Sequence, residues 1–329
     1  MRRRAFIALL GGAALASPHL ALAQTSDGMR RIGALFSQTE SDPEGQARAA
    51  ALRQGLQQLG WIEGRNLQIA YRWSGGRADR MRAYAAELVS QRPELIFASA
   101  TTALVALQQA THTIPIVFAQ VTDPVGAGFV KSLARPGGNI TGLTQHEFSI
   151  GVKWLELLKQ IAPHVTHAAI LYDPGNPATA GYLRTIESAA RTFGVEVAPA
   201  AVRDAAEIAR AIDTLAARPN GGLILLPGPV GAVNRKAIIE LAARHRLPAV
   251  YAFRYHIVSG GLASYGVDNI DLFRRAAWYV DRILKGQKPG ELPVQNATKF
   301  QLVINRKTAQ ALGLELPIAL LARTDEVIE

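Results

Sequence analysis

The sequence predicts an α/β protein with two similar lobes, each built on a parallel β-sheet. Short apolar runs alternate with longer amphipathic segments along most of the chain, which is the pattern of parallel βαβ units. This pattern occurs as two successive series that meet near Gly151. The tail departs from simple alternation, so we expect the chain to cross between the lobes more than once and to form a hinge there.

The first series predicts the N-terminal lobe. Short apolar runs predict strands at residues 31–36, 67–73, 95–98, 116–119 and 139–144. Amphipathic segments predict helices at residues 44–60 and 79–91. The first of these helices ends at Gly60, a residue type that accepts the left-handed conformation of a helix C-cap. The stretch 142–151 is the expected first crossing.

The second series predicts the C-terminal lobe. A helix from about residue 151 stops before Pro163, because proline disfavours helix at the preceding residue. Further elements are expected as strands at 167–172, 195–200, 222–226, 249–252 and 300–304, and as helices at 179–193, 205–217, 233–245 and 269–284. The expected division is 24–145 plus approximately 266–288 for the first lobe, and 146–265 plus approximately 289–329 for the second.

Residues 1–23 have the features of a secretory signal peptide. Three arginines precede a short apolar run, and Ala21 and Ala23 form the small-x-small pattern that signal peptidase accepts. We therefore expect cleavage after Ala23 and a periplasmic protein, exported by the general secretory or the twin-arginine route. The chain contains no cysteine, so it has no disulfide and no lipid-anchoring cysteine.

Charge and composition restrict the classes of partner that the protein is expected to bind. Removing the leader lowers the formal net charge from +10 to +7. The remaining charges alternate in sign along helical stretches and form no dense basic stripe, so no nucleic-acid partner is predicted. Contact with the membrane is expected only through a partner protein.

Motifs for catalysis and cofactors are missing. The sequence has no Gly-x-Ser-x-Gly elbow, no phosphate-binding Gly-rich loop and no dinucleotide fingerprint. His164 and His167 lie around a turn after Pro163, which does not favour a two-histidine metal site. We therefore predict no enzyme, no metal and no cofactor, although an exported enzyme on the same fold stays an alternative.

The candidate binding residues follow the strands, because ligands of open parallel sheets bind beyond the carboxyl ends of the strands. In the first lobe these residues are Ser37, Ser99, Thr101, Thr102, Thr122 and Asp123. A helix start at Thr101 and Thr102 could hold a carboxylate, although ordinary N-capping uses the same geometry. In the second lobe they are Asn176, Phe253 and Tyr255, whose rings could form an apolar wall or belong to the core.

Several motifs together resemble the ABC transporter substrate-binding protein family that includes tryptophan- and tyrosine-binding members. The matching segments are TTAL (101–104), QQAT (108–111), IPIVF (114–118), TDPVG (122–126), ARPGGNITG (134–142), KWLELL (153–158), GGLASYG (260–266) and LPV (292–294). The resemblance covers nearly the whole mature chain. It implies a type I periplasmic binding fold with two Rossmann-like lobes, a multi-strand hinge and no catalysis.

The resemblance also implies roles for single residues. Ser99, Thr101 and Thr102 would hold an amino-acid-like carboxylate, and Thr122 and Asp123 would line the cleft. Asn176 and Asp268 would lie in the other wall and the hinge, with Asp268 a partner for a ligand amine.

The predicted function is therefore capture of a small solute for an ABC importer, whose permease and ATPase subunits are the expected partners. A cytoplasmic sugar-repressor core is disfavoured by the leader and by the lack of a helix-turn-helix before Arg31. A receptor that presents its ligand to a sensor protein, and not to an importer, stays an alternative.

Overall fold

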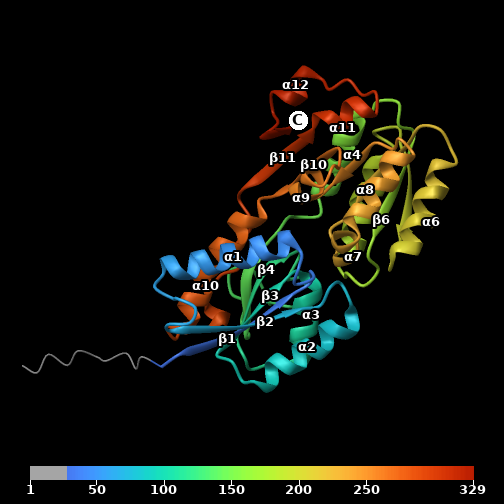
Figure 1. Cartoon of the computed structure of the whole chain (residues 1–329). Helices are drawn as coiled ribbons and strands as arrows, with labels where there is room; N and C mark the ends of the chain where they lie inside the picture. Colours follow the sequence, from blue (N-terminus) through green and yellow to red (C-terminus); the bar gives the residue numbers. More distant parts are fainter. Residues whose placement is uncertain (1–27) are drawn as a thin grey trace, which may run out of the picture.

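The computed structural model describes residues 28–329, and the leader predicted at residues 1–23 lies outside this range. Two β-sheets form the cores of two lobes, and helices lie on both faces of each sheet (Figure 1). The predicted α/β class with two largely parallel sheets is confirmed.

The first sheet has the strand order β2-β1-β3-β4-β5, and all its strands are parallel. The strands are β1 (Arg30–Phe36), β2 (Leu67–Trp73), β3 (Leu95–Ser99), β4 (Ile116–Val121) and β5 (Ile140–Thr144). Successive side chains point to opposite faces, so buried Phe36 and Leu35 belong to separate hydrophobic clusters. One face carries α1 (Pro43–Gln58) and α10 (Asn269–Leu284), and the other carries α2 (Ala78–Ser90) and α3 (Thr101–Ala110) (Figure 1).

Helix α10 returns from the last third of the chain to lie beside α1 (Figure 1). The approach is close at Gly55, where a Cβ atom would lie 2.4 Å from the carbonyl oxygen of Arg274 and 2.7 Å from Cβ of Ala277. Glycine at this position therefore allows the two helices to pack.

The second sheet has the strand order β12-β11-β10-β9-β8-β6-β7, in which β11 runs antiparallel to β10 and the other pairs are parallel. The strands are β6 (His167–Tyr172), β7 (Glu196–Ala201), β8 (Gly221–Leu225), β9 (Ala249–Tyr251), β10 (Ala263–Val267), β11 (Phe300–Asn305) and β12 (Glu326–Ile328). The helices are α4 (Ile150–Ile161), α5 (Thr179–Ala190), α6 (Ala205–Ala216), α7 (Pro229–Val233), α8 (Arg235–Arg244), α9 (Arg254–Val258), α11 (Arg306–Ala311) and α12 (Ile318–Leu321), with a 3₁₀ turn η1 (Pro289–Glu291).

Most predicted elements lie within a few residues of the observed ones, and the helix predicted at 233–245 corresponds to α8. Several short elements were not predicted, namely α7, α9, α11, α12 and β12. Strand β10 was not predicted, because its segment ASYGV contains serine and glycine and lacks a continuous apolar run.

Three crossing segments connect the two sheets: one follows β5, one follows β10 and one precedes β11. Oγ1 of Thr144 lies 2.9 Å from Oδ1 of Asn296, which joins the first and third crossings. The same two segments, together with Tyr265 of β10, line a cavity of about 330 Å³. Before the third crossing the chain still pairs with the first sheet, through a β-bridge between Leu143 and Gln295.

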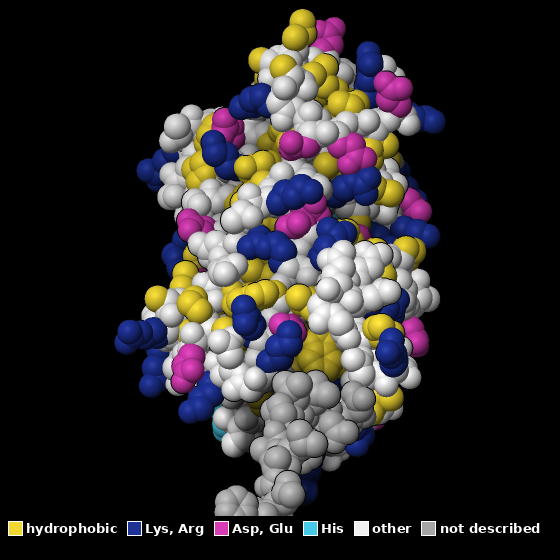
Figure 2. Space-filling model, turned by 90° about the vertical axis from the view of Figure 1, so that its left-hand side faces the viewer, with side chains coloured by type: hydrophobic (Ala, Val, Ile, Leu, Met, Phe, Trp, Pro, Cys, Tyr) yellow, Lys and Arg dark blue, Asp and Glu magenta, His cyan; other side chains and the backbone are white. Residues whose placement is uncertain are grey.

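The surface in Figure 2 mixes charges of both signs. Lysine and arginine side chains are scattered over this face with aspartate and glutamate between them, as the alternating charges of the sequence lead one to expect. Within residues 28–329, no helix is both long enough and apolar enough to cross a bilayer.

Candidate ligand-binding site

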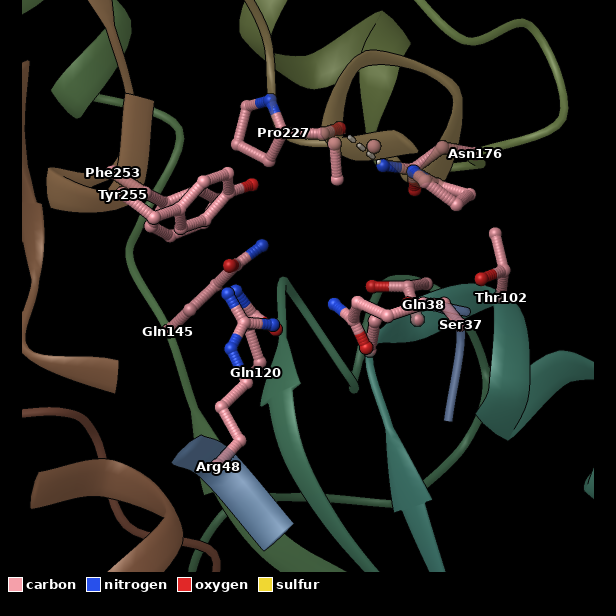
Figure 3. Close-up of a pocket in the computed structure, with 15 residues that line it drawn as sticks. Ser37, Gln38, Arg48, Thr102, Gln120, Gln145, Asn176, Pro227, Phe253 and Tyr255 are labelled. Atoms are coloured by element: carbon pink, nitrogen blue, oxygen red, sulfur yellow. Dashed lines mark hydrogen bonds between the residues drawn. The ribbon is translucent and has the colours of Figure 1, made fainter. Parts of the chain in front are cut away.

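A cavity lies between the two lobes, where the strands of both sheets end (Figure 3). Its lining residues come from both lobes: Ser37, Gln38, Arg48, Ala100, Thr101, Thr102, Gln120, Gln145, Asn176, Pro227, Gly228, Pro229, Ala232, Phe253 and Tyr255. The free volume is about 30 Å³, which is space for roughly two water molecules. The side chains of the two lobes therefore leave little free space at this point of the cleft.

The start of helix α3 borders the cavity without a side-chain cap. Its N-cap residue is Ala100, whose φ of 79° lies in a region that favours glycine. Oγ1 of Thr102 is buried and has no hydrogen-bond partner. The first N–H groups of a helix lack partners within the helix and attract negative charge. This end of the cavity is therefore suited to an anionic group.

Arg48 brings a charged group to the cavity from helix α1, and its side chain is 1% exposed. Its Nε donates to Oε1 of Glu44 at 2.8 Å, and its Nη1 donates to Oε1 of Gln120 at 2.7 Å. Its Nη2 is buried without a partner. A buried unpaired donor is costly, so this nitrogen is available to an acceptor on a ligand.

Amide side chains surround the guanidinium (Figure 3). Gln120 donates to Oδ1 of Asn269 at 3.1 Å, and Gln145 donates to Oγ1 of Thr122 at 2.6 Å. The Oε1 atoms of Gln38 and Gln145 have no partner. The cavity therefore offers both donors and acceptors.

The second lobe contributes an aromatic wall and one amide. Phe253 and Tyr255 stack with ring centroids 5.6 Å apart at 18° (Figure 3). Burial raises the pKa of the Tyr255 phenol above its ordinary value, so the hydroxyl stays protonated. Asn176 is held in place, because its Nδ2 donates to the Pro227 carbonyl at 2.9 Å and its Oδ1 accepts from the Ala178 N–H at 3.1 Å.

Hydrogen bonds link the lobes beside the cavity. The Tyr182 hydroxyl of α5 lies 2.7 Å from Oγ1 of Thr122, which follows β4, and 2.9 Å from Nδ1 of His146. Burial lowers the pKa of His146 to about 3, so its imidazole is neutral at pH 7.

Six of the ten predicted site residues line the cavity together: Ser37, Thr101, Thr102, Asn176, Phe253 and Tyr255. Ser99 is the buried last residue of β3, and its Oγ has no partner, but it does not line the cavity. Thr122 is bonded to Tyr182 and Gln145 instead of facing the cavity.

The two predicted acidic residues lie elsewhere. Asp123 is exposed in a turn, where its Oδ1 accepts from the Gly126 N–H at 2.8 Å. Asp268 is the N-cap of α10 and accepts from the Asp271 N–H at 3.1 Å. It also pairs with Lys299 at 2.8 Å. Both carboxylates are therefore occupied by local structural contacts.

Four polar residues of the cavity are not among the ten predicted site residues: Gln38, Arg48, Gln120 and Gln145. Gln38 directly follows Ser37, and Gln120 lies two residues before Thr122 at the end of β4, so the position of both at strand ends was a usable signal. Arg48 carries no such signal, because it lies within an amphipathic helix among residues typical of a solvated face. Among residues 28–329, no cluster of three metal-ligating side chains is present.

Known proteins share the sequence and the fold. The family described as ABC transporter substrate binding protein matches residues 37–328. A tyrosine-binding protein from Clostridioides difficile (strain R20291) is 28% identical over 266 residues, which are 79% of this chain and 74% of the relative.

Two solved structures are similar over 91% of this chain and 99% of their own. A conserved domain protein from Vibrio cholerae has 32% identity and a TM-score of 0.85. An ABC domain from Streptococcus pneumonia in complex with L-Trp has 27% identity and a TM-score of 0.84. The predicted family resemblance is thereby confirmed. Proteins of this family are solute-binding proteins that work with transporter components, and they typically act outside the cytoplasm. The chain belongs to the ABC transporter substrate-binding protein family.

Proposed function

We propose that this protein is exported to the periplasm and captures a small carboxylate-bearing solute, of about amino-acid size, in the cleft between its lobes, where the small cavity adjoins a second cavity of about 540 Å³ that shares Thr102 and Pro229 with it. It then delivers the solute to the permease and ATPase subunits of an ABC importer without changing it chemically. The observation that carries this proposal is the uncapped start of α3, which opens with the free Thr102 hydroxyl into a cavity lined by both lobes.

The carboxylate is proposed to lie at Thr101 and Thr102. A helix N-terminus offers free N–H groups and a favourable dipole to an anion. Thr102 adds a buried hydroxyl without a partner, and Oγ1 of Thr101 is engaged only by a long contact of 3.5 Å from the Thr122 N–H. Because no side chain caps this helix, a ligand can complete it.

Closure of the lobes is the proposed mechanism of capture. In this proposal the first lobe consists of the first sheet with its helices, including α10, and the second lobe consists of the second sheet with its helices. The three crossing segments join the two lobes. A solute that contacts Thr102 in one lobe and Tyr255 in the other would favour the closed form. Two similar proteins, a tyrosine-binding protein and an ABC domain solved in complex with L-Trp, support a carboxylate-bearing solute with an aromatic group.

A thermal-shift screen of the mature protein against carboxylic acids, amino acids, sugars and nucleosides tests the proposal. A ligand at ~100 times its Kd should add about 2.7 kcal/mol to the free energy of unfolding. We expect hits among the carboxylates. NMR of the ligand after prolonged incubation should show it unchanged, and turnover would contradict a pure receptor.

The double variant Thr101→Ala/Thr102→Ala tests the carboxylate position. Hydrogen bonds to a charged group contribute about 1.5–3 kcal/mol, so affinity for the hit should fall at least tenfold. Thr214→Ala is the matched control, because it removes a helix hydroxyl that only bonds the Arg210 carbonyl of its own helix. Equal affinities for the double variant and the control would refute this position.

A further inference from the structure

The lining of the cavity includes a single charged side chain. Among its fifteen lining residues, all within the described part of the chain, Arg48 is the one with a charged side chain. No aspartate or glutamate is among these fifteen. An α-amino acid carries an ammonium group, and burying that group without a carboxylate costs several kcal/mol. The lining therefore offers a ligand ammonium no carboxylate, and its unpaired acceptors are the neutral amide oxygens of Gln38 and Gln145.

The carboxylates nearest to Arg48 are already engaged. Glu44 accepts from Nε of Arg48 at 2.8 Å, and Asp42 accepts from Nη1 of Arg235 at 2.6 Å. Neither carboxylate lines the cavity. A ligand ammonium would therefore have to share a carboxylate that already pairs with a guanidinium group.

The aromatic wall is also close to positive charge. Cζ of Arg48 lies 5.4 Å from the ring centroid of Tyr255, and Cζ of Arg235 lies 5.8 Å from the same centroid. Aromatic faces attract cations, but here two guanidinium groups are already near this ring. An ammonium group placed against Tyr255 would therefore be repelled by both.

One further carboxylate, that of Asp173, lies outside the small cavity. Asp173 lines a separate, larger cavity of about 540 Å³ that shares Thr102 and Pro229 with the first. Its Oδ1 accepts from the Gly175 N–H at 2.8 Å. A ligand that extended past Thr102 into this larger cavity could place an ammonium group against Asp173. We call this placement of an amino acid the competing arrangement.

We propose that the cleft prefers carboxylic acids that carry an oxygen acceptor in place of the α-ammonium group, namely 2-oxo acids, over the matching amino acids. The free Nη2 of Arg48 donates to the oxo oxygen while the carboxylate lies at the start of α3. This inference rests on the proposed carboxylate site at Thr101 and Thr102.

Matched pairs of acids test the preference with the unmodified mature protein. Calorimetry at pH 7.5 should compare pyruvate with alanine, 4-methyl-2-oxopentanoate with leucine, 2-oxoglutarate with glutamate, and phenylpyruvate with phenylalanine. We expect the oxo acid of the pair that binds to have a Kd at least tenfold lower. An amino acid that binds as tightly as its oxo acid would overturn this inference and leave the proposed function intact. If no acid in any pair binds, the carboxylate site itself fails and this inference fails with it.

Substitutions of Arg48 test whether this residue causes the preference for 2-oxo acids over amino acids. Arg48→Gln should weaken the oxo acid at least tenfold and should not weaken the amino acid, which changes the ratio between them. Equal weakening of both would show a merely structural role for Arg48 and overturn the assignment. The double variant Glu44→Gln/Arg48→Gln removes both charges of the buried pair and gives the same test without leaving an unpaired carboxylate.

Two further variants complete the design. Arg53→Gln is the matched control, because Arg53 lies on the same helix with a 40% exposed side chain outside the cavity, and it should change neither Kd. Asp173→Asn should leave the oxo acid unchanged. Loss of amino-acid binding in Asp173→Asn, together with tight amino-acid binding by the unmodified protein, would establish the competing arrangement.

Discussion

Asp42 and Arg235 form a bidentate ion pair across the interlobe cleft. Oδ2 of Asp42 lies 2.6 Å from Nη1 of Arg235, and its Oδ1 lies 3.2 Å from Nη2. The two side chains are 6% and 12% exposed. Asp42 is the N-cap of α1 in the first lobe, and Arg235 begins α8 in the second. This pair therefore forms when the lobes are closed.

Substituting Arg235 should open the lobes. Arg235→Gln removes the charged partner of Asp42, and breaking a buried charge pair at an interface costs about 2–5 kcal/mol. Part of that cost acts on the closed form alone, so we expect ligand affinity to fall about tenfold or more. Calorimetry measures the affinity, and X-ray scattering measures the radius of gyration, which should rise in the ligand-free variant.

Arg244→Gln provides the comparison for this prediction, since Arg244 is an exposed residue at the other end of α8. It should leave both affinity and radius of gyration unchanged. If Arg235→Gln behaves in the same way, the ion pair does not contribute to closure.

Removal of the Tyr182 hydroxyl should destabilise the protein. In Tyr182→Phe the ring keeps its packing against Trp154 and Phe148, but Thr122 and His146 lose their shared partner. Leaving buried polar groups unpaired costs about 1–3 kcal/mol. Urea unfolding should show a loss of this size at an unchanged m-value. The comparison is Tyr84→Phe on α2, whose hydroxyl has no hydrogen-bond partner among residues 28–329, and an equal effect of both changes would refute the network.

Acid should destabilise the fold through two buried histidines. Burial lowers the pKa of His146 and of His256 to about 3, below the ordinary value of 6.5. The unfolded chain therefore binds these protons at a higher pH than the folded chain, so the free energy of unfolding falls as pH drops from about 6.5 toward 3. At pH 5 the loss is about 2 kcal/mol for each histidine.

Unfolding by urea at pH 7 and pH 5 measures this loss. His256→Gln should reduce the difference between the two pH values by about half. His112→Gln removes an exposed histidine and should preserve the full difference. A pH dependence that is the same in His256→Gln and in the unsubstituted protein would contradict the assignment.

The strands and long helices were predictable because each has a strong local signal. Helix α10 was predicted with both of its observed bounds, since an amphipathic pattern follows Asp268, which caps the helix. The antiparallel pairing of β11 with β10 was not predictable, because it depends on where the chain crosses between the sheets. The sequence shows that a tail segment such as Phe300–Asn305 is a strand but does not show which strand it joins.

The binding site was predictable in part for the same reason. Thr101 and Thr102 follow a strand, and that position led to the correct edge of the sheet. Asp268 also follows a strand, but its nearest donors belong to its own helix and to Lys299. Arg48 reaches the cavity from within a helix, so only the packing of α1 against the sheet brings it there.

The exchange of tail segments between the lobes has a consequence for biosynthesis. The first lobe needs α10, which ends at Leu284, and the second needs β12, which ends at Ile328. A growing polypeptide therefore leaves an apolar face of the first sheet uncovered until residue 284 has been synthesised, and leaves β11 of the second sheet without its neighbour until residue 328 has been synthesised. Each lobe thus completes its fold only after a late segment of the chain is available, and the unfinished chain exposes surfaces that favour aggregation.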